Sequence, residues 1–266
     1  MFQPLYVAAT GLNAAESELL EITNNVANAK TPGFKAGKTE MENLPYIQKS
    51  FKDVLDEKMA AYDSSSNIIP EFGTGVRVAA TPKDFSQGTL ETTSNPLDIA
   101  IQGEGFFQVE MPDGSTAYTR AGHFRVDNEG NLVDANGHFV QPSIVLPEGT
   151  TSIVIRPDGT VLVSLNNEKN QTEIGQINLA KFSNPVGLTS LGQNLFASSP
   201  SSGEPIFGFA GESGYGTINQ YAIESSNVDV ISEMMHMVMV QRVFETITKA
   251  VSGYENMLTA LERMKA

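Results

Sequence analysis

The chain has 266 residues, of which 40% are hydrophobic and 18% charged, a balance typical of a globular protein rather than a disordered or collagen-like chain. Acidic residues outnumber basic ones 31 to 17, giving a formal net charge of −14, which argues against nucleic acid as a partner. The absence of cysteine excludes disulfides and thiolate metal sites.

Residues 1–33 are predicted to form a long N-terminal helix. Its apolar residues alternate at spacings of four and three, the heptad pattern of a coiled-coil seam. The stretch Thr31-Pro32-Gly33 is predicted to end the helix. The seam comprises Leu5, Ala8, Leu12, Ala15, Leu19, Ile22, Val26 and Ala29. Further apolar surface off the seam is expected from Val7, Ala14 and Leu20.

The first residues lack the basic and apolar regions of a cleaved secretion signal, and no apolar run is long enough to insert into a membrane. Residues 34–72 are predicted to connect the helix to the next domain. Residues 46–62 could form a short helix within this segment. The segment is either a plain linker or an arm that touches neighbouring subunits, and composition leaves both open.

Residues 73–224 are predicted to form a central antiparallel β domain, a barrel or a sandwich. Short β-rich runs alternate with turn sequences such as Pro157-Asp158-Gly159, which tolerate the backbone reversal of a hairpin. The expected strands lie at residues 76–80, 97–101, 106–110, 117–120, 123–126, 131–133, 152–155, 161–165 and 176–182.

Residues 225–266 are predicted to hold a second long helix that begins after Ser225-Ser226-Asn227, a cluster able to cap a helix. Its seam comprises Met234, Met237, Val240, Phe244, Ile247, Val251, Tyr254, Leu258 and Leu261. Off the seam lie Met235, Val238, Met239 and Val243. The predicted fold class is therefore α+β, with the terminal helices forming a coiled-coil-like pair beside the β domain.

The two seams have two possible partners. They either face each other or the body of the same chain, or they pack against neighbouring subunits. The second interpretation is favoured, because two helices cannot cover each other's off-seam surface. The acidic excess also lies almost entirely between the helices, which leaves the ends nearly neutral and able to pack in many copies.

The sequence offers little catalytic chemistry. The three histidines are scattered, so no metal site is predicted. Gly103-Glu104-Gly105 begins like a dinucleotide fingerprint but lacks the third glycine and the helix, and is interpreted as a tight turn between strands. Residues 127–131 are interpreted as a hairpin turn rather than a calcium loop. No catalytic, cofactor-binding or metal-binding residue is predicted, and the chain is expected not to be an enzyme.

Four sequence blocks, in order along the chain, resemble the rod and hook proteins of the bacterial flagellum. They lie at residues 23–35, 94–109 and 118–124, with a C-terminal block at 224–230 and 241–245. Val243-Phe244 departs from the Ala-Tyr that is common in the family. The residues that carry the resemblance include Asn24, Asn25, Asn28, Gly33, Phe34, Gly103, Gly105, Phe106, Phe107, Asn227, Gln241 and Arg242.

The resemblance implies a structural subunit of the flagellar basal body that polymerises into a rigid hollow drive shaft, without a cofactor. Within the family, the chain looks most like the distal-rod type; a proximal-rod or hook-type subunit is the alternative. The implied partners are copies of itself, proximal rod and hook subunits, surrounding ring proteins and the flagellar export apparatus, but neither nucleic acid nor a membrane. The family also links the insertion after the first helix to straightness, which suggests residues 46–72 as a stiffening element.

Two functions of other classes stay open from the residues alone. One is a secreted β-domain enzyme with helical dimerisation arms, which would need a polar catalytic cluster. The other is a secreted monomeric binding module whose terminal helices pair only with each other. Oligomeric state separates both from a rod subunit.

Overall fold

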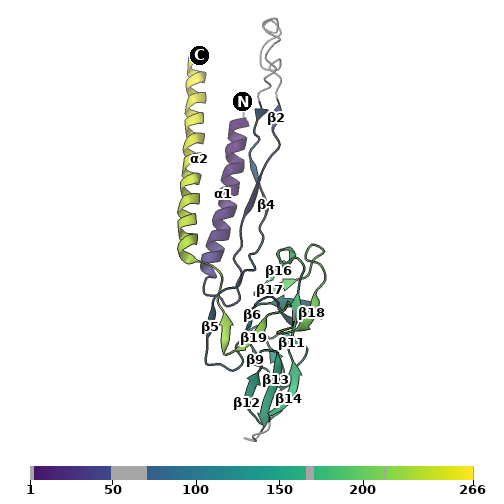
Figure 1. Ribbon diagram of the computed structural model, residues 1–266. Coiled ribbons are helices and arrows are strands. Elements are labelled where there is room, and N and C mark those ends of the chain that lie inside the picture. Colours follow the sequence, from purple (N-terminus) through teal and green to yellow (C-terminus); the bar gives the residue numbers. More distant parts are fainter. Residues whose placement is uncertain (1–2, 49–70, 166–170, 213, 266) are drawn as a thin grey trace. The chain divides into compact units, whose positions relative to one another are not determined.

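The computed structural model describes residues 3–48, 71–165, 171–212 and 214–265 (Figure 1). The chain divides into two compact units. The described residues within 1–24, 37–82 and 231–266 form the first, here called the helical unit. Residues 25–36 and the described part of 83–230 form the second, the β unit.

The helical unit contains the terminal helices α1 (Gln3–Ala27) and α2 (Val230–Lys265) and a β ribbon. In the ribbon, β1 (Glu40–Asn43) pairs antiparallel with β4 (Val76–Ala80), and β2 (Ile47–Gln48) pairs with β3 (Glu71–Phe72). Residues 49–62 of the short helix expected at 46–62 lie outside the described residues, as does most of the suggested stiffening segment. No helix in the described ranges is both long and apolar enough to cross a membrane.

Helix α1 ends at Ala27, four residues before the predicted stop at Thr31-Pro32-Gly33. The predicted end of the helix was wrong, because hydrogen bonds between residues three apart replace the α-helical ones from Asn28 onward. The Asn28 N–H donates to Asn25 O at 3.2 Å and the Ala29 N–H to Val26 O at 3.3 Å, which replaces the four-residue spacing of an α-helix. Ala29 of the predicted seam therefore lies beyond the helix.

The terminal helices pair antiparallel. A methyl group on Gly11 would lie 3.2 Å from Ile247 Cδ1, while Glu18 Oε1 lies 2.9 Å from His236 Nε2. Moving forward along α1 thus means moving backward along α2, as Figure 1 shows. On another side of α1, Thr10 Oγ1 accepts a hydrogen bond from the Val76 N–H of β4 at 3.3 Å. The predicted pair of terminal helices is confirmed, and α1 lies between α2 and the ribbon.

The β unit is antiparallel throughout its described strand pairs, which confirms the predicted central domain. In the described part, its largest sheet has seven strands in the order β16 (Thr189–Gly192), β17 (Leu195–Ala197), β8 (Thr116–Thr119), β7 (Phe107–Glu110), β11 (Phe139–Gln141), β10 (Leu132–Val133) and β9 (Arg125–Val126). A second sheet has the order β12 (Thr150–Ile155), β13 (Thr160–Leu165) and β14 (Gln171–Gln176).

Smaller strand pairs and a 3₁₀ turn at Pro185–Gly187 complete the unit. The pairs are β15 (Asn178–Lys181) with β18 (Ile206–Phe209), β6 (Ile99–Gln102) with β19 (Thr217–Gln220), and β5 (Leu90–Thr92) with β20 (Ala222–Glu224). Every β-rich run predicted from the sequence overlaps a strand, although β4 belongs to the helical unit.

The core of the β unit is aliphatic with a few aromatic rings. Ile99, Phe107 and Ile177 are inaccessible to solvent, and Phe107 meets Phe124 edge to face with ring centroids 5.2 Å apart. A separate cluster holds Phe106, Tyr118, Phe182 and Phe196 with their neighbours. Phe106 and Phe107 of the family block thus point into different clusters, because successive residues of a strand face opposite sides of a sheet.

Candidate functional site

A buried ion pair joins the segment after α1 to the segment before α2. Lys35 is 2% exposed and Glu224, the last residue of β20, is 1% exposed. Lys35 Nζ donates to Glu224 Oε1 at 2.7 Å and to Ser86 O at 2.6 Å. Burial lowers the pKa of Lys35, and the Glu224 carboxylate opposes that shift. Each partner therefore offsets part of the cost of burying the other's charge.

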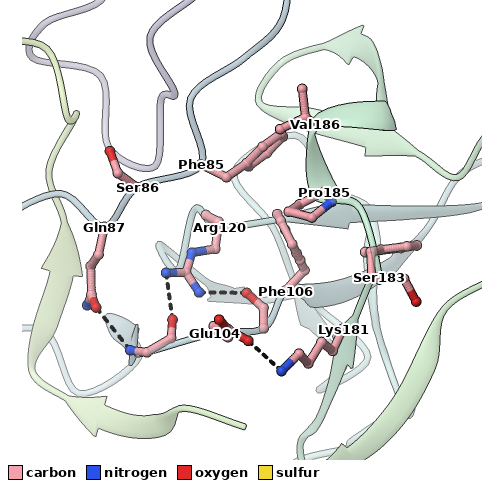
Figure 2. A pocket seen from close by; sticks show the side chains of 13 residues that line it. Phe85, Ser86, Gln87, Glu104, Phe106, Arg120, Lys181, Ser183, Pro185 and Val186 are labelled. Carbon is pink, nitrogen blue, oxygen red and sulfur yellow. Dashed lines mark hydrogen bonds and ion pairs between the residues drawn. The ribbon is translucent and has the colours of Figure 1, made fainter. Parts of the chain in front are cut away.

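Arg120 is the second cation on the same carboxylate. Its Nε lies 3.0 Å from Glu224 Oε2. Figure 2 shows its other bonds: Nη1 donates to Gly105 O at 2.6 Å and Nη2 to Gly103 O at 2.9 Å. Burial lowers the pKa of Arg120, with Glu224 again opposing that shift. One buried carboxylate thus balances two buried cations. Each guanidinium nitrogen of Arg120 therefore contacts an oxygen of the chain itself.

The turn at Gly103 and Gly105 connects β6 to β7, so its interpretation as a tight turn between strands is confirmed. The φ angles of these glycines, +111° and +140°, are conformations that side chains rarely allow, and they aim both carbonyls at Arg120. The Gly103 N–H is taken by Gln87 Oε1 at 3.0 Å. The turn therefore binds the Arg120 guanidinium through its carbonyl oxygens. A phosphate site would instead need backbone N–H groups that are available to a ligand.

The Asn227 side chain forms a third set of hydrogen bonds beside the Lys35–Glu224 pair. Its Oδ1 accepts from the Ala36 N–H at 2.8 Å, and its Nδ2 donates to Asp84 O at 2.9 Å and to Ser86 Oγ at 3.0 Å. We refer to Lys35, Arg120, Glu224 and Asn227 together as the polar junction. All of its members belong to the β unit.

Gly33 packs directly against this junction. Its N–H donates to Glu224 O at 2.7 Å, its φ is +71°, and an added Cβ would lie 2.6 Å from Ala121 N. We expect Gly33→Ala to lower the free energy of unfolding of the β unit by at least ~2 kcal/mol in urea denaturation, because backbone atoms must shift. Gly114→Ala is the control: φ is +79° there but the space is open, so only the ~1 kcal/mol of left-handed strain is expected. Equal losses in both variants would contradict the close approach.

The other residues of the family motif lie at several places. At the end of α1, Asn25 is buried, and Asn28 Oδ1 accepts from Thr31 Oγ1 at 3.2 Å. Asn24 lies in the last turn of α1, and Phe34 is buried with Lys83 Nζ 5.5 Å from its ring centre. Gln241 and Arg242 are exposed on α2. Sequence reasoning placed Lys35, Arg120 and Glu224 inside the matching blocks but assigned them no role, because a charged residue carries no sequence signal of burial.

The residues of the predicted assembly seam differ in how far the structure exposes them to solvent. Ile22 and Val240 are buried. Half-buried positions are Leu5, Leu12, Leu19, Val26, Met237, Ile247, Val251, Tyr254 and Leu258. Exposed positions are Met234, Phe244 and Leu261. Ala14, expected to add free apolar surface, is only 2% exposed and adds none, whereas Leu20 is 66% exposed as expected.

One face of α2 near its start is apolar and open. Its apolar side chains are between 48% and 71% exposed and, with Arg242, they line a hollow of about 460 Å³. Val243 adjoins this surface and is 52% exposed. We call the surface the methionine face; it comprises Ile231, Met234, Met235, Val238, Met239 and Arg242. Monomeric proteins rarely keep such a surface bare, so it is a candidate interface.

Outside the polar junction, the histidines of the described residues each lie beside a carboxylate. No group of three or more histidines, aspartates and glutamates in the described ranges could hold a metal ion. His123, His138 and His236 each contact a single carboxylate, of Asp98, Asp134 and Glu18 respectively.

Three family models match the chain in sequence. They are the flagella basal body rod protein model at residues 5–35, the D1 domain of the flagellar hook proteins FlgE/F/G at 100–163, and the C-terminal region of the flagellar basal body rod FlgEFG proteins at 219–264. These ranges include Lys35, Arg120, Glu224 and Asn227, and also the methionine face. Both candidate sites therefore lie in regions that the family models describe.

Full-length relatives agree with these models. The flagellar basal-body rod protein FlgG of Caulobacter vibrioides is 36% identical over 99% of this chain and all of its own length. The FlgG proteins of Agrobacterium fabrum and Bacillus subtilis are 37% and 31% identical over 97% and 100% of this chain. The flagellar hook protein FlgE of Escherichia coli is 23% identical over 97% of it. The similarity to the rod proteins is thus the greater.

Proposed function

Because the chain belongs to the family of flagellar basal-body rod and hook proteins, we propose that it assembles with copies of itself through the exposed apolar surface of its terminal helices. It is a structural subunit of the distal rod of the bacterial flagellum, located in the basal body. Its 35–37% identity to several rod proteins along the whole chain, against 23% to a hook protein, supports the rod.

The observation that carries the assembly proposal is the methionine face. A fully buried Ile, Met or Val side chain contributes about 1.5–3 kcal/mol. In a single chain this face of α2 is exposed, so that contribution is gained only when another surface covers it. Helices from neighbouring copies supply such a surface, and methionine side chains adapt well to helix contacts.

The seams are proposed to have both of the roles that the sequence left open. Gly11 approaches Ile247 within the chain, so part of the seam closes the α1–α2 pair. Met234, Phe244 and Leu261 stay exposed and are proposed to contact other copies. The division of the chain into helical ends and a β domain is proposed to serve this role, with helices in the wall of the shaft. No catalytic activity is proposed.

Further partners are proposed from the family. They are the proximal rod and hook subunits at the two ends of the shaft, the surrounding ring proteins, and the export apparatus through which the chain passes. Residues 46–72 are proposed to stiffen the shaft by touching neighbouring copies; the ribbon of β2 and β3 carries the described ends of this segment.

We expect the purified chain to form tubes or short rods at high concentration, visible by sedimentation and negative-stain electron microscopy. Limited proteolysis should cut the terminal helices of the free chain, because long helices with a bare apolar face open readily in water. The same bonds should be protected in the polymer. A chain that stays monomeric at every concentration, with termini as resistant as its β unit, would instead fit a monomeric binding module.

A further inference from the structure

The chain passes between the helical unit and the β unit four times within the described residues, after Asn24, Ala36, Pro82 and Val230. On the β-unit side, these passages emerge from segments that we call tethers: residues 25–36, 83–88 and 224–230. These tethers are the covalent connections through which a force that turns one unit against the other can pass. How they are fastened together therefore decides how the force is shared.

The first and last tethers are fastened at successive points. The Gly33 N–H donates to Glu224 O at 2.7 Å, Lys35 Nζ to Glu224 Oε1 at 2.7 Å, and the Ala36 N–H to Asn227 Oδ1 at 2.8 Å. Glu224 accepts these hydrogen bonds with both its backbone carbonyl and its side-chain carboxylate. The segment that follows α1 and the segment that precedes α2 are thus joined over several residues.

The middle tether is fastened to both of the others. The Asp84 N–H donates to Ala36 O at 2.7 Å and Lys35 Nζ to Ser86 O at 2.6 Å, which joins it to the first tether. Asn227 Nδ2 donates to Asp84 O at 2.9 Å and the Gly88 N–H to Glu224 Oε1 at 3.0 Å, which joins it to the last. The three tethers form one network.

The network is also anchored to the sheets of the β unit. Arg120 follows β8 and contacts Glu224. It also donates to the Gly103 and Gly105 carbonyls of the turn between β6 and β7 (Figure 2). Asn194, beside β17, donates to Pro32 O at 3.0 Å. The anchor therefore reaches the largest sheet, as well as the core strand β6.

We propose that the polar junction is a load-sharing coupling: it fastens every passage between the two units into one network, so that torque is borne by several backbone segments at once. The proposal rests on the proposed role as a rod subunit. Hydrogen bonds to buried charges suit this task, because each is directional and because breaking one leaves a charge without a partner in a dry site. Purely apolar packing there would resist separation but would allow sliding.

The test uses Asn227→Ala, which removes ties of the last tether to both of the other tethers without unbalancing a buried charge. The variant is expressed in cells that lack their own copy of the gene, and bead rotation is measured at low and high load. We expect a normal number of rods and normal rotation at low load, but rod failure about tenfold more frequent at high load. Asn184→Ala, which loses an exposed hydrogen bond to Ser201 O that joins no two tethers, should behave as the parent at both loads.

Intact Asn227→Ala rods that match the parent at high load would overturn the proposal. If this variant builds no rods, hydrogen exchange of the purified chain decides instead. Amide exchange about tenfold faster at Ala36, Gly88 and Ser225 together supports one network, whereas faster exchange at Ala36 alone contradicts it. Complete rods in cells without the gene would contradict the rod function itself, and the exchange result would still report on the junction.

Discussion

Glu224→Gln lowers the free energy of unfolding of the β unit by about 3–5 kcal/mol, because Lys35 and Arg120 then remain buried with no anion between them. A neutral amide can still accept hydrogen bonds, but it cannot offset the charge of two desolvated cations. Urea denaturation of the purified chain measures the loss. The chain has no tryptophan and seven tyrosines, so tyrosine fluorescence, with Tyr118 buried in the β unit, is a suitable signal.

Glu104→Gln is the matched control for this prediction. Glu104 also pairs with a lysine, Lys181, at 2.5 Å, but the two side chains are 71% and 37% exposed. Water screens such a pair, so its loss should change the free energy of unfolding by less than about 1 kcal/mol. Lys35→Met provides a second measurement, since it leaves Glu224 with Arg120 and should cost less than Glu224→Gln. A Glu224→Gln loss as small as that of Glu104→Gln would show that the carboxylate does not hold the junction.

The terminal helices were predictable because an amphipathic helix repeats its apolar residues over many turns. Both seams were identified, and the exposure of Val238 and Met239 off the seam was expected and found. The end of α1 was not predicted correctly. It depends on backbone hydrogen bonds of Asn25 and Asn28, which the spacing of apolar residues does not indicate. Ala14 was misjudged for a related reason: a small residue on a flank fits wherever another element approaches closely.

Strands were predictable where they are apolar and bordered by turns. β13, with four successive buried residues, gave a clear signal, whereas β16 is exposed at every position and gave none. β1 was missed because its sequence, Glu-Met-Glu-Asn, is polar, and its pairing with β4 depends on residues distant in the chain. A polar edge strand is defined by its partner rather than by its own composition.

The polar junction was the least predictable feature. Lys35, Arg120 and Glu224 are separated by 85 and 104 positions and look like ordinary surface charges in the sequence. Only the fold brings them together around one carboxylate. The resemblance to flagellar proteins marked the blocks that contain them, but a block identifies a family without saying which of its residues are buried or what each one contacts.

Val238→Glu on the methionine face should abolish polymerisation and motility while leaving the folded chain intact. Val238 is 48% exposed in the single chain, so the substitution should change the free energy of unfolding by about 0.5 kcal/mol or less. In the proposed polymer, the same carboxylate would be desolvated against apolar side chains at a cost of several kcal/mol. Every copy repeats that cost, so tubes should be absent in negative stain and cells should not swim.

Ser252→Glu separates this effect from the mere addition of charge to α2. Ser252 is polar and exposed on the same helix, outside the methionine face, so this variant should still polymerise and support swimming. Val238→Met, which keeps the face apolar, should do the same. If Val238→Glu polymerises as well as these two controls, the methionine face is not the interface. Assembly would then depend on another surface, such as the exposed residues Phe244 and Leu261 further along the seam.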